Sequence, residues 1–125
     1  MTYEEQQQYD SLPYSGREEY DWVKSRHPSW SHQQIMTKVA ISISIEDPDK
    51  GILGKRGQTD INPKDPKIME AILKGAKNFL TSAGIFIYEV FSVIDDALDT
   101  LGDLIVSGAS YVGNKLKDFW DWLTN

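Results

Sequence analysis

The chain has 125 residues, of which 40% are hydrophobic and 26% are charged, so its composition is that of a globular domain and not of a disordered chain. Its formal net charge of −6 argues against a protein that coats nucleic acid. It has no Cys and only two His, which excludes disulfides, thiolate nucleophiles and Cys-based zinc sites.

The charges are divided unevenly along the chain. Residues 1–22 carry a net charge of −5, residues 23–81 carry +4, and residues 82–125 carry −5. A basic middle between acidic ends is common where oppositely charged segments pack against one another. The basic segment could also form a surface that binds an anionic partner. We favour internal complementarity between the segments.

The first residues are acidic and no apolar stretch follows them, so they do not resemble a secretion signal. The longest runs without Asp, Glu, Lys, Arg or His, 78–88 and 104–114, have 11 residues each, whereas a transmembrane helix needs about 18 or more. We therefore expect a cytoplasmic protein, with signal-independent export as the alternative.

Residues 1–14 are polar and rich in Gln, and we expect a flexible arm there, extended or docked on a partner. A pair of short helices is predicted over 15–46. Ser15 and Glu18 match a capping box for the first helix. That helix is expected to end near Arg26, because the residue after it precedes a proline.

The second helix of the pair is predicted over 32–46. Ser31 and Gln34 match another capping box, and apolar residues then recur on one helical face. The alternation of Ile and Ser over 41–45 is typical of a strand, so a short strand at 40–45 is the alternative.

Two short helices joined by four residues also raise the hypothesis of a DNA-reading helix-turn-helix. The second helix would then present His32, Gln33, Thr37 and Lys38 to the bases. The first helix is acidic and the turn has no Gly, so we favour a plain helical hairpin.

Residues 47–65 are interrupted by Pro and Gly, which predicts a basic loop or linker. Within it, residues 54–57 read Gly-Lys-Arg-Gly and match the GXXG loop by which KH domains clamp a nucleotide backbone. A proline follows soon after and the strands of that fold are not evident. Nucleic-acid binding through residues 50–56 is therefore a third choice.

Residues 66–125 are predicted to form an amphipathic helical region. Asp65 as the cap and Pro66 at the first position predict a helix that ends near 82–84. Two further helices, roughly 84–106 and 110–123, are expected, with one continuous helix as the alternative. A heptad row runs through both. Its members are Phe91, Leu98, Ile105, Val112 and Phe119, and Ile87, Ile94 and Leu101 form a companion row.

The chain closes with Trp120 and Trp122, which point well apart around a helix. We expect at least one of these rings to be exposed in the isolated chain and buried by a partner. A protein surface and a membrane interface are both suitable partners for an exposed Trp.

No residue is predicted to be catalytic, to hold a cofactor or to ligate a metal. The two histidines are five residues apart across a proline turn, and the acidic residues of the C-terminal helices lie opposite the apolar rows. A solvated face is the better interpretation of those acids, so we do not expect an enzyme.

The sequence therefore predicts an all-α, non-enzymatic interaction or assembly protein, such as an adaptor, a structural subunit or a cargo-type subunit. It would bind a protein partner or a second copy of itself through the heptad row, which we call the C-terminal seam. The predicted interaction residues are Phe91, Leu98, Ile105, Val112, Phe119, Trp120 and Trp122. The first alternative is a membrane-active effector whose amphipathic helices meet lipid, although net acidity argues against anionic bilayers.

Overall fold

The computed structural model describes residues 1–46, 65–109, 112, 114–117, 119 and 121, without the side chains of residues 45 and 46. This part of the chain is all-helical, as predicted. Apart from Asp65, the predicted linker 47–65 lies outside it, and so does the GXXG loop. The five helices are α1 (Tyr3–Ser11), α2 (Tyr14–Arg26), α3 (His32–Glu46), α4 (Pro66–Ser82) and α5 (Tyr88–Val106).

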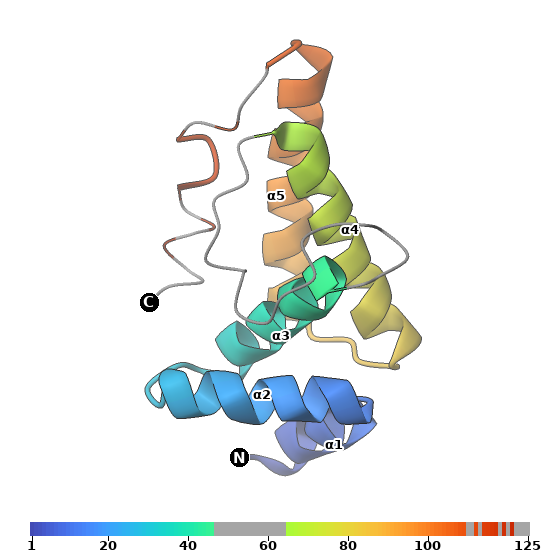
Figure 1. Cartoon of the computed structure of the whole chain (residues 1–125), viewed down its shortest axis with the longest axis vertical. Coiled ribbons are helices and arrows are strands. Elements are labelled where there is room, and N and C mark those ends of the chain that lie inside the picture. The colour runs from blue at the N-terminus through green and yellow to red at the C-terminus, as the bar shows by residue number, and fades with distance from the viewer. Residues whose placement is uncertain (47–64, 110–111, 113, 118, 120, 122–125) are drawn as a thin grey trace.

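Helix α3 is the central element of the fold. It packs against α2, α4 and α5, while α4 also packs along α5. Figure 1 shows α4 and α5 running in opposite directions, with α1 and α2 gathered at the end of the molecule where α5 begins. The connection from α4 to α5 therefore lies at the same end of the molecule as α1.

Residues 3–11, which we expected to be part of an extended or docked arm, form helix α1. Its start is a capping box that was not predicted. The Thr2 hydroxyl accepts a hydrogen bond from the Glu5 backbone N–H at 3.1 Å, and the Glu5 carboxylate accepts one from the Thr2 N–H at 2.9 Å. Leu12, the residue before Pro13, is extended and ends the helix.

The predicted capping box at Ser15 is wrong, because α2 begins before that residue. Pro13 occupies the cap position without a side-chain hydrogen bond, and its carbonyl accepts from the Arg17 N–H at 3.0 Å. The proline has a fixed φ near −65°, which places the chain at the edge of a helix without help from a serine. The predicted end at Arg26 is confirmed.

The predicted start of α3 is confirmed. The Ser31 hydroxyl accepts from the Gln34 backbone N–H at 3.2 Å, and the Gln34 side chain accepts from the Ser31 N–H at 3.0 Å. The alternative strand at 40–45 is wrong, since α3 continues to Glu46. Ile41 and Ser42 are both buried, because a helix with neighbours on several sides buries successive residues. Alternation in the sequence is then no sign of a strand.

Asp65 and Pro66 start α4 as predicted, with the Asp65 carboxylate accepting from the Lys67 N–H at 2.9 Å. Helices α4 and α5 end in the same way, on Gly84 (φ +75°) and Gly108 (φ +77°). After each glycine, a backbone N–H returns to the last turn in a Schellman motif: Ile85 to the Leu80 carbonyl and Ala109 to the Leu104 carbonyl, both at 2.9 Å.

Gly108 rules out the single long helix that was the alternative for the C-terminal half. The chain breaks at 107–109, and α5 begins at Tyr88 and not near residue 84. In the predicted helix 110–123, residues 117, 119 and 121 are helical, and its residues 110, 111, 113, 118, 120, 122 and 123 lie outside the described part.

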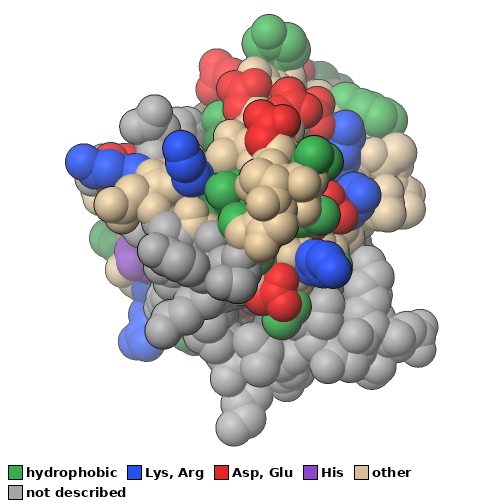
Figure 2. All heavy atoms as spheres, turned by 90° about the horizontal axis from the view of Figure 1, so that it is seen from above, with side chains coloured by type: hydrophobic (Ala, Val, Ile, Leu, Met, Phe, Trp, Pro, Cys, Tyr) green, Lys and Arg blue, Asp and Glu red, His purple; other side chains and the backbone are tan. Residues whose placement is uncertain are grey.

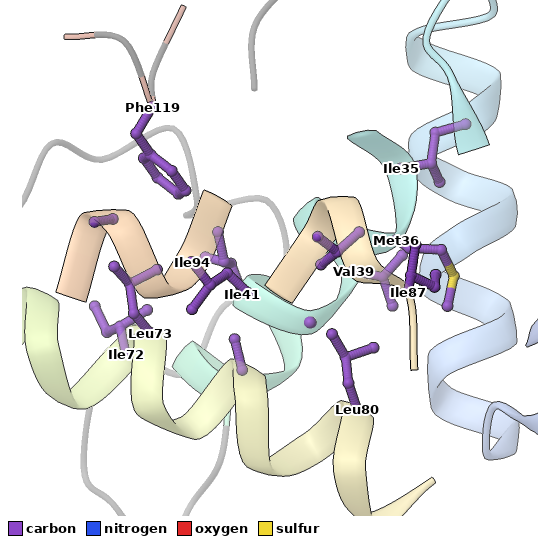
Figure 3. Close-up of a cluster of buried hydrophobic side chains, with 14 of the residues drawn as sticks. Ile35, Met36, Val39, Ile41, Ile72, Leu73, Leu80, Ile87, Ile94 and Phe119 are labelled. Carbon is purple, nitrogen blue, oxygen red and sulfur yellow. The ribbon is translucent and has the colours of Figure 1, made fainter. Parts of the chain in front are cut away.

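The hydrophobic core collects side chains from α2, α3, α4 and α5 and from the chain after α5. Figure 3 shows Phe119 directed toward α5 from the chain that follows this helix, and Phe119 belongs to the same cluster as Ile94 and Leu73. Burial of this kind supplies about 25 cal/mol for each Å² of apolar surface removed from water. Its labelled members are Ile35, Met36, Val39, Ile41, Ile72, Leu73, Leu80, Ile87, Ile94 and Phe119.

Candidate functional site

The connection between α4 and α5 presents two aromatic side chains to solvent. Phe86 is 69% exposed and Tyr88 is 85% exposed. Ile85, which precedes them, and Ile87, which lies between them, are buried. Ile87 has an extended backbone (φ −114°, ψ 109°), and successive side chains of an extended chain point to opposite sides. The two isoleucines therefore anchor the segment in the core and turn both aromatic rings outward.

Two open hollows of about 470 and 480 Å³ adjoin these rings on the side of α1. Phe86 lines both of them, together with Glu4 and Gln8 of α1, and Tyr88 lines the second. We call the two hollows with these residues the aromatic groove. One wall of the groove is thus α1, and the other is the segment that leads into α5.

The groove is acidic. Glu4 lines both hollows, Asp10 lines the first, and Glu5 and Glu89 line the second. No Lys, Arg or His side chain lines either hollow in the part of the chain that the structure describes. The pKa of Glu5 is lowered, chiefly by its hydrogen bond from the Thr2 backbone, so this carboxylate is well stabilised in its charged form.

Helix α1 is fixed against the rest of the fold by polar contacts. The Tyr9 hydroxyl donates to the Asp21 carboxylate of α2 at 3.0 Å, and the Gln8 side-chain oxygen lies 2.8 Å from His32 Nε2 in α3. The other ring nitrogen of His32 lies 2.8 Å from the Tyr20 hydroxyl. Because α1 is tied to two helices, its wall of the groove is formed before any partner arrives.

Phe86 also has support from within the fold. Its ring stacks against the ring of Phe91 in α5, with 6.1 Å between centroids and 20° between planes. Phe91 is itself half-buried against the core. One face of the exposed ring is thereby supported, and much of the remainder is open to solvent.

The predicted heptad row falls into two environments. Phe91 and Leu98 are half-buried and pack against the core, and Ile105 is half-buried at the end of α5. Val112 and Phe119 are buried in the core. Trp120 and Trp122 lie outside the described residues. The fully buried side of α5 consists instead of Val90, Ile94, Ala97 and Leu101.

A third hollow, of about 340 Å³, lies between α5 and the chain after it. Ala97 and Thr100 of α5 line it together with Leu116 and Phe119, and Asp96 and Lys115 add one charge of each sign. Several neighbouring residues after 109 lie outside the described part of the chain.

The remaining carboxylates of α5 lie on a solvated face, as the sequence predicts. Figure 2, a view onto the end of the molecule where α5 ends, shows acidic side chains gathered together. Asp95 forms an ion pair with Lys77 of α4 at 2.7 Å, and Asp96, Asp99 and Asp103 are exposed. Within the described ranges, no three metal-ligating side chains are placed to hold an ion.

The residues that a DNA-reading helix would present are not available on α3. His32, Thr37 and Lys38 are buried, and Gln33 is half-buried. The two histidines also lie in separate surroundings. The His32 ring is hydrogen-bonded in the interior, while the His27 ring stacks on Trp30 with centroids 3.8 Å apart.

None of the described helices is both long enough and apolar enough to cross a lipid bilayer. No protein family, no characterised protein and no solved structure gives a match to this chain. Function is therefore inferred from the chemistry of its surface.

The sequence pattern does not single out Phe86 and Tyr88, because its helical periodicity predicts a helix from residue 84 onward. Two signals could have found them. Gly84 follows a helical pattern and is a natural helix end, and Ile-Phe-Ile-Tyr over 85–88 alternates in the manner of an extended chain. Their position beside α1 is a tertiary relationship that no local pattern encodes.

Proposed function

We propose that this chain is a non-enzymatic interaction protein that binds another protein through the aromatic groove. The proposal depends mainly on one observation, the exposure of Phe86 and Tyr88 beside two hollows. Exposed aromatic side chains that lie together are typical of interface anchors. Burial of one such ring against a partner is worth about 1.5–3 kcal/mol.

The predicted C-terminal seam has a smaller role in this proposal than the sequence pattern alone suggests. Its buried members pack inside the fold. Among the described members, Phe91, Leu98 and Ile105 are partly exposed and could contact a partner. An adaptor, structural or cargo-type subunit in the cytoplasm is the kind of protein we propose. A second copy of the chain is the alternative partner.

Affinity capture from cells that express the protein tests this proposal. The tagged chain is compared with a variant carrying Phe86→Ser and Tyr88→Ser, and with Tyr14→Ser as the matched control. Tyr14 is 72% exposed but lines neither hollow of the groove. We expect a set of proteins that the control retains and the double variant loses, as measured by quantitative mass spectrometry. Equal capture by all three chains would contradict the proposal.

Two further measurements separate the alternatives. Sedimentation over a range of concentrations reveals a second copy as the partner. Leakage of dye from lipid vesicles reveals the membrane-active effector that was the alternative from sequence. Circular dichroism confirms that the variants remain folded, which we expect because both substituted rings are largely exposed.

A further inference from the structure

We propose that the occupant of the aromatic groove is a cationic segment of a protein partner, with Lys or Arg side chains placed over the exposed rings and beside the groove carboxylates. This inference depends on the proposed function, because it specifies the chemistry of the partner at the same surface. Two properties of the groove support this inference. Its aromatic faces and its negative charge both attract the cationic head group of a Lys or Arg side chain.

The aromatic faces attract cations. A Lys or Arg head group over the face of a Phe or Tyr ring is attracted by the negative face of the ring, and more strongly when water is excluded. Phe86 lines both hollows and Tyr88 lines the second, so a bound chain would meet both rings. The fold already contains one contact of this kind, since the Arg26 guanidinium lies 5.0 Å from the centroid of the Trp22 ring.

The carboxylates attract the same head groups. Glu4 and Glu89 stand beside the rings and are exposed, and neither forms an ion pair with a described residue. Asp95 on α5 differs from them, because Lys77 already neutralises it at 2.7 Å. Glu4 and Glu89 are therefore free to pair with cations that a partner brings.

The same charges argue against other classes of partner. Nucleic acids and anionic membranes are bound through Lys and Arg that neutralise phosphate. The described lining of the groove has carboxylates and no basic side chain. A purely apolar segment would leave the groove carboxylates facing apolar atoms, and burial of unpaired charge is costly.

The shape of the groove also favours a peptide segment over a folded surface. The two hollows share Phe86, Glu4 and Gln8, so they adjoin one another across the same ring. A chain that follows both hollows can place successive side chains on either side of Phe86. Because the α1 wall is already fixed, the groove itself loses little conformational freedom on binding.

The test uses a fluorescently labelled peptide of alternating Arg and Gly, and the same peptide with neutral citrulline in place of Arg. Binding to the full chain is measured by fluorescence anisotropy at about 150 mM salt, where exposed charges more than about 8 Å apart are largely screened. We expect the Arg peptide to bind and the citrulline peptide to bind at least about tenfold more weakly, a difference of about 1.4 kcal/mol.

Matched variants separate the groove from the overall negative charge. Glu4→Gln with Glu89→Gln removes two groove carboxylates, and Asp99→Asn with Asp103→Asn removes two exposed carboxylates of α5 that line neither hollow. Both pairs change the net charge equally. We expect the first pair to weaken binding of the Arg peptide about fivefold or more and the second pair to change it less than twofold.

The aromatic contribution is tested by Tyr88→Ala, with Tyr14→Ala as its control. Tyr88 is 85% exposed, so its removal leaves the fold intact while the charge of the groove stays the same. We expect weaker binding for Tyr88→Ala alone. Equal effects of the two carboxylate pairs, equal effects of the two tyrosine variants, or tight binding of the citrulline peptide would each overturn the proposal.

Failure of this inference and failure of the proposed function give different results. If cellular capture depends on Phe86 and Tyr88 while the Arg peptide does not bind, the cationic partner is wrong and the interaction surface stands. If capture does not depend on these rings, the proposed function fails whatever the peptide does. Self-association that is lost in Tyr88→Ala would overturn the choice of a separate protein as the partner.

Discussion

His32 Nδ1 lies 2.8 Å from the Tyr20 hydroxyl, in a contact that joins α3 to α2 inside the fold. The other ring nitrogen of His32 lies 2.8 Å from the Gln8 side-chain oxygen, which can only accept a hydrogen bond. His32 Nε2 therefore carries the proton, and Nδ1 accepts from Tyr20. Both residues are buried, so their polar atoms depend on one another.

Tyr20→Phe should lower the free energy of unfolding by about 1–3 kcal/mol, because it leaves His32 Nδ1 buried without a donor. Tyr14→Phe is the matched control, since Tyr14 is 72% exposed and its hydroxyl can bond to water. Urea denaturation followed by circular dichroism measures both variants. A loss of stability no larger for Tyr20→Phe than for Tyr14→Phe would show that the buried hydrogen bond contributes little.

The burial of His32 predicts a dependence of stability on pH. Burial lowers the pKa of His32 below its ordinary value of 6.5, although the Glu5 carboxylate acts in the opposite direction. As the pH falls below 6.5, His32 becomes protonated in the unfolded chain while it is still neutral in the folded chain. The stabilising effect of neutral His32 is therefore complete above 6.5 and is lost as the pH falls through the lowered pKa.

Urea denaturation at several pH values between about 5 and 7.5 checks this dependence, in the range where histidines titrate. We expect the free energy of unfolding to fall toward the acidic end, and the slope to be smaller in His32→Gln. A proton NMR titration of the folded chain should give a pKa for His32 below 6.5. A pKa above that value would reverse the expected sign.

Replacement by alanine should change the stability of the fold in opposite directions at Gly84, which precedes α5, and at Gly102, which lies inside α5. Gly84 has φ +75°, a conformation that costs an L-residue about 1–2 kcal/mol, so Gly84→Ala should destabilise the fold by about that amount. Gly102 lies inside α5 with open space where a Cβ would stand. Gly102→Ala should therefore stabilise the fold by about 0.5–1 kcal/mol.

Thermal denaturation of the two glycine variants is sufficient to test this pair. Each substitution adds the same methyl group, so any difference between them comes from backbone conformation. The explanation of the helix end at Gly84 would have to be abandoned if Gly84→Ala were as stable as the wild type.

The parts of the fold that sequence predicted are those with local causes. Ser31 with Gln34 and Asp65 with Pro66 satisfy backbone N–H groups within one turn, so the residues alone indicate where α3 and α4 begin. The Thr2 and Glu5 capping box has the same local cause. The polar, Gln-rich composition of residues 1–14 favours an arm and conceals this local signal.

The parts that sequence could not predict depend on contacts between distant segments. The row through Leu98 and the row through Leu101 have the same heptad spacing, and only the positions of α3 and α4 decide which row is buried. The candidate site has the same origin. Phe86 and Glu4 line one groove although they are far apart in sequence, and no local pattern brings them together.

The two rows of α5 provide the last prediction. Leu101 is fully buried, and its replacement by Ala removes methyl groups from the packed core and leaves a cavity. Leu101→Ala should therefore cost about 2–5 kcal/mol of stability. Ile105 is half-buried at the end of the helix, so part of its side chain is in water already.

Ile105→Ala should consequently cost less than half as much as Leu101→Ala when both are measured by urea denaturation. Leu98→Ala should fall between them, because Leu98 is half-buried but packs against the core. Equal losses at positions 101 and 105 would mean that the predicted seam and its companion row are buried alike. The row through Leu98 and Ile105 would then have no free surface to contribute to a partner.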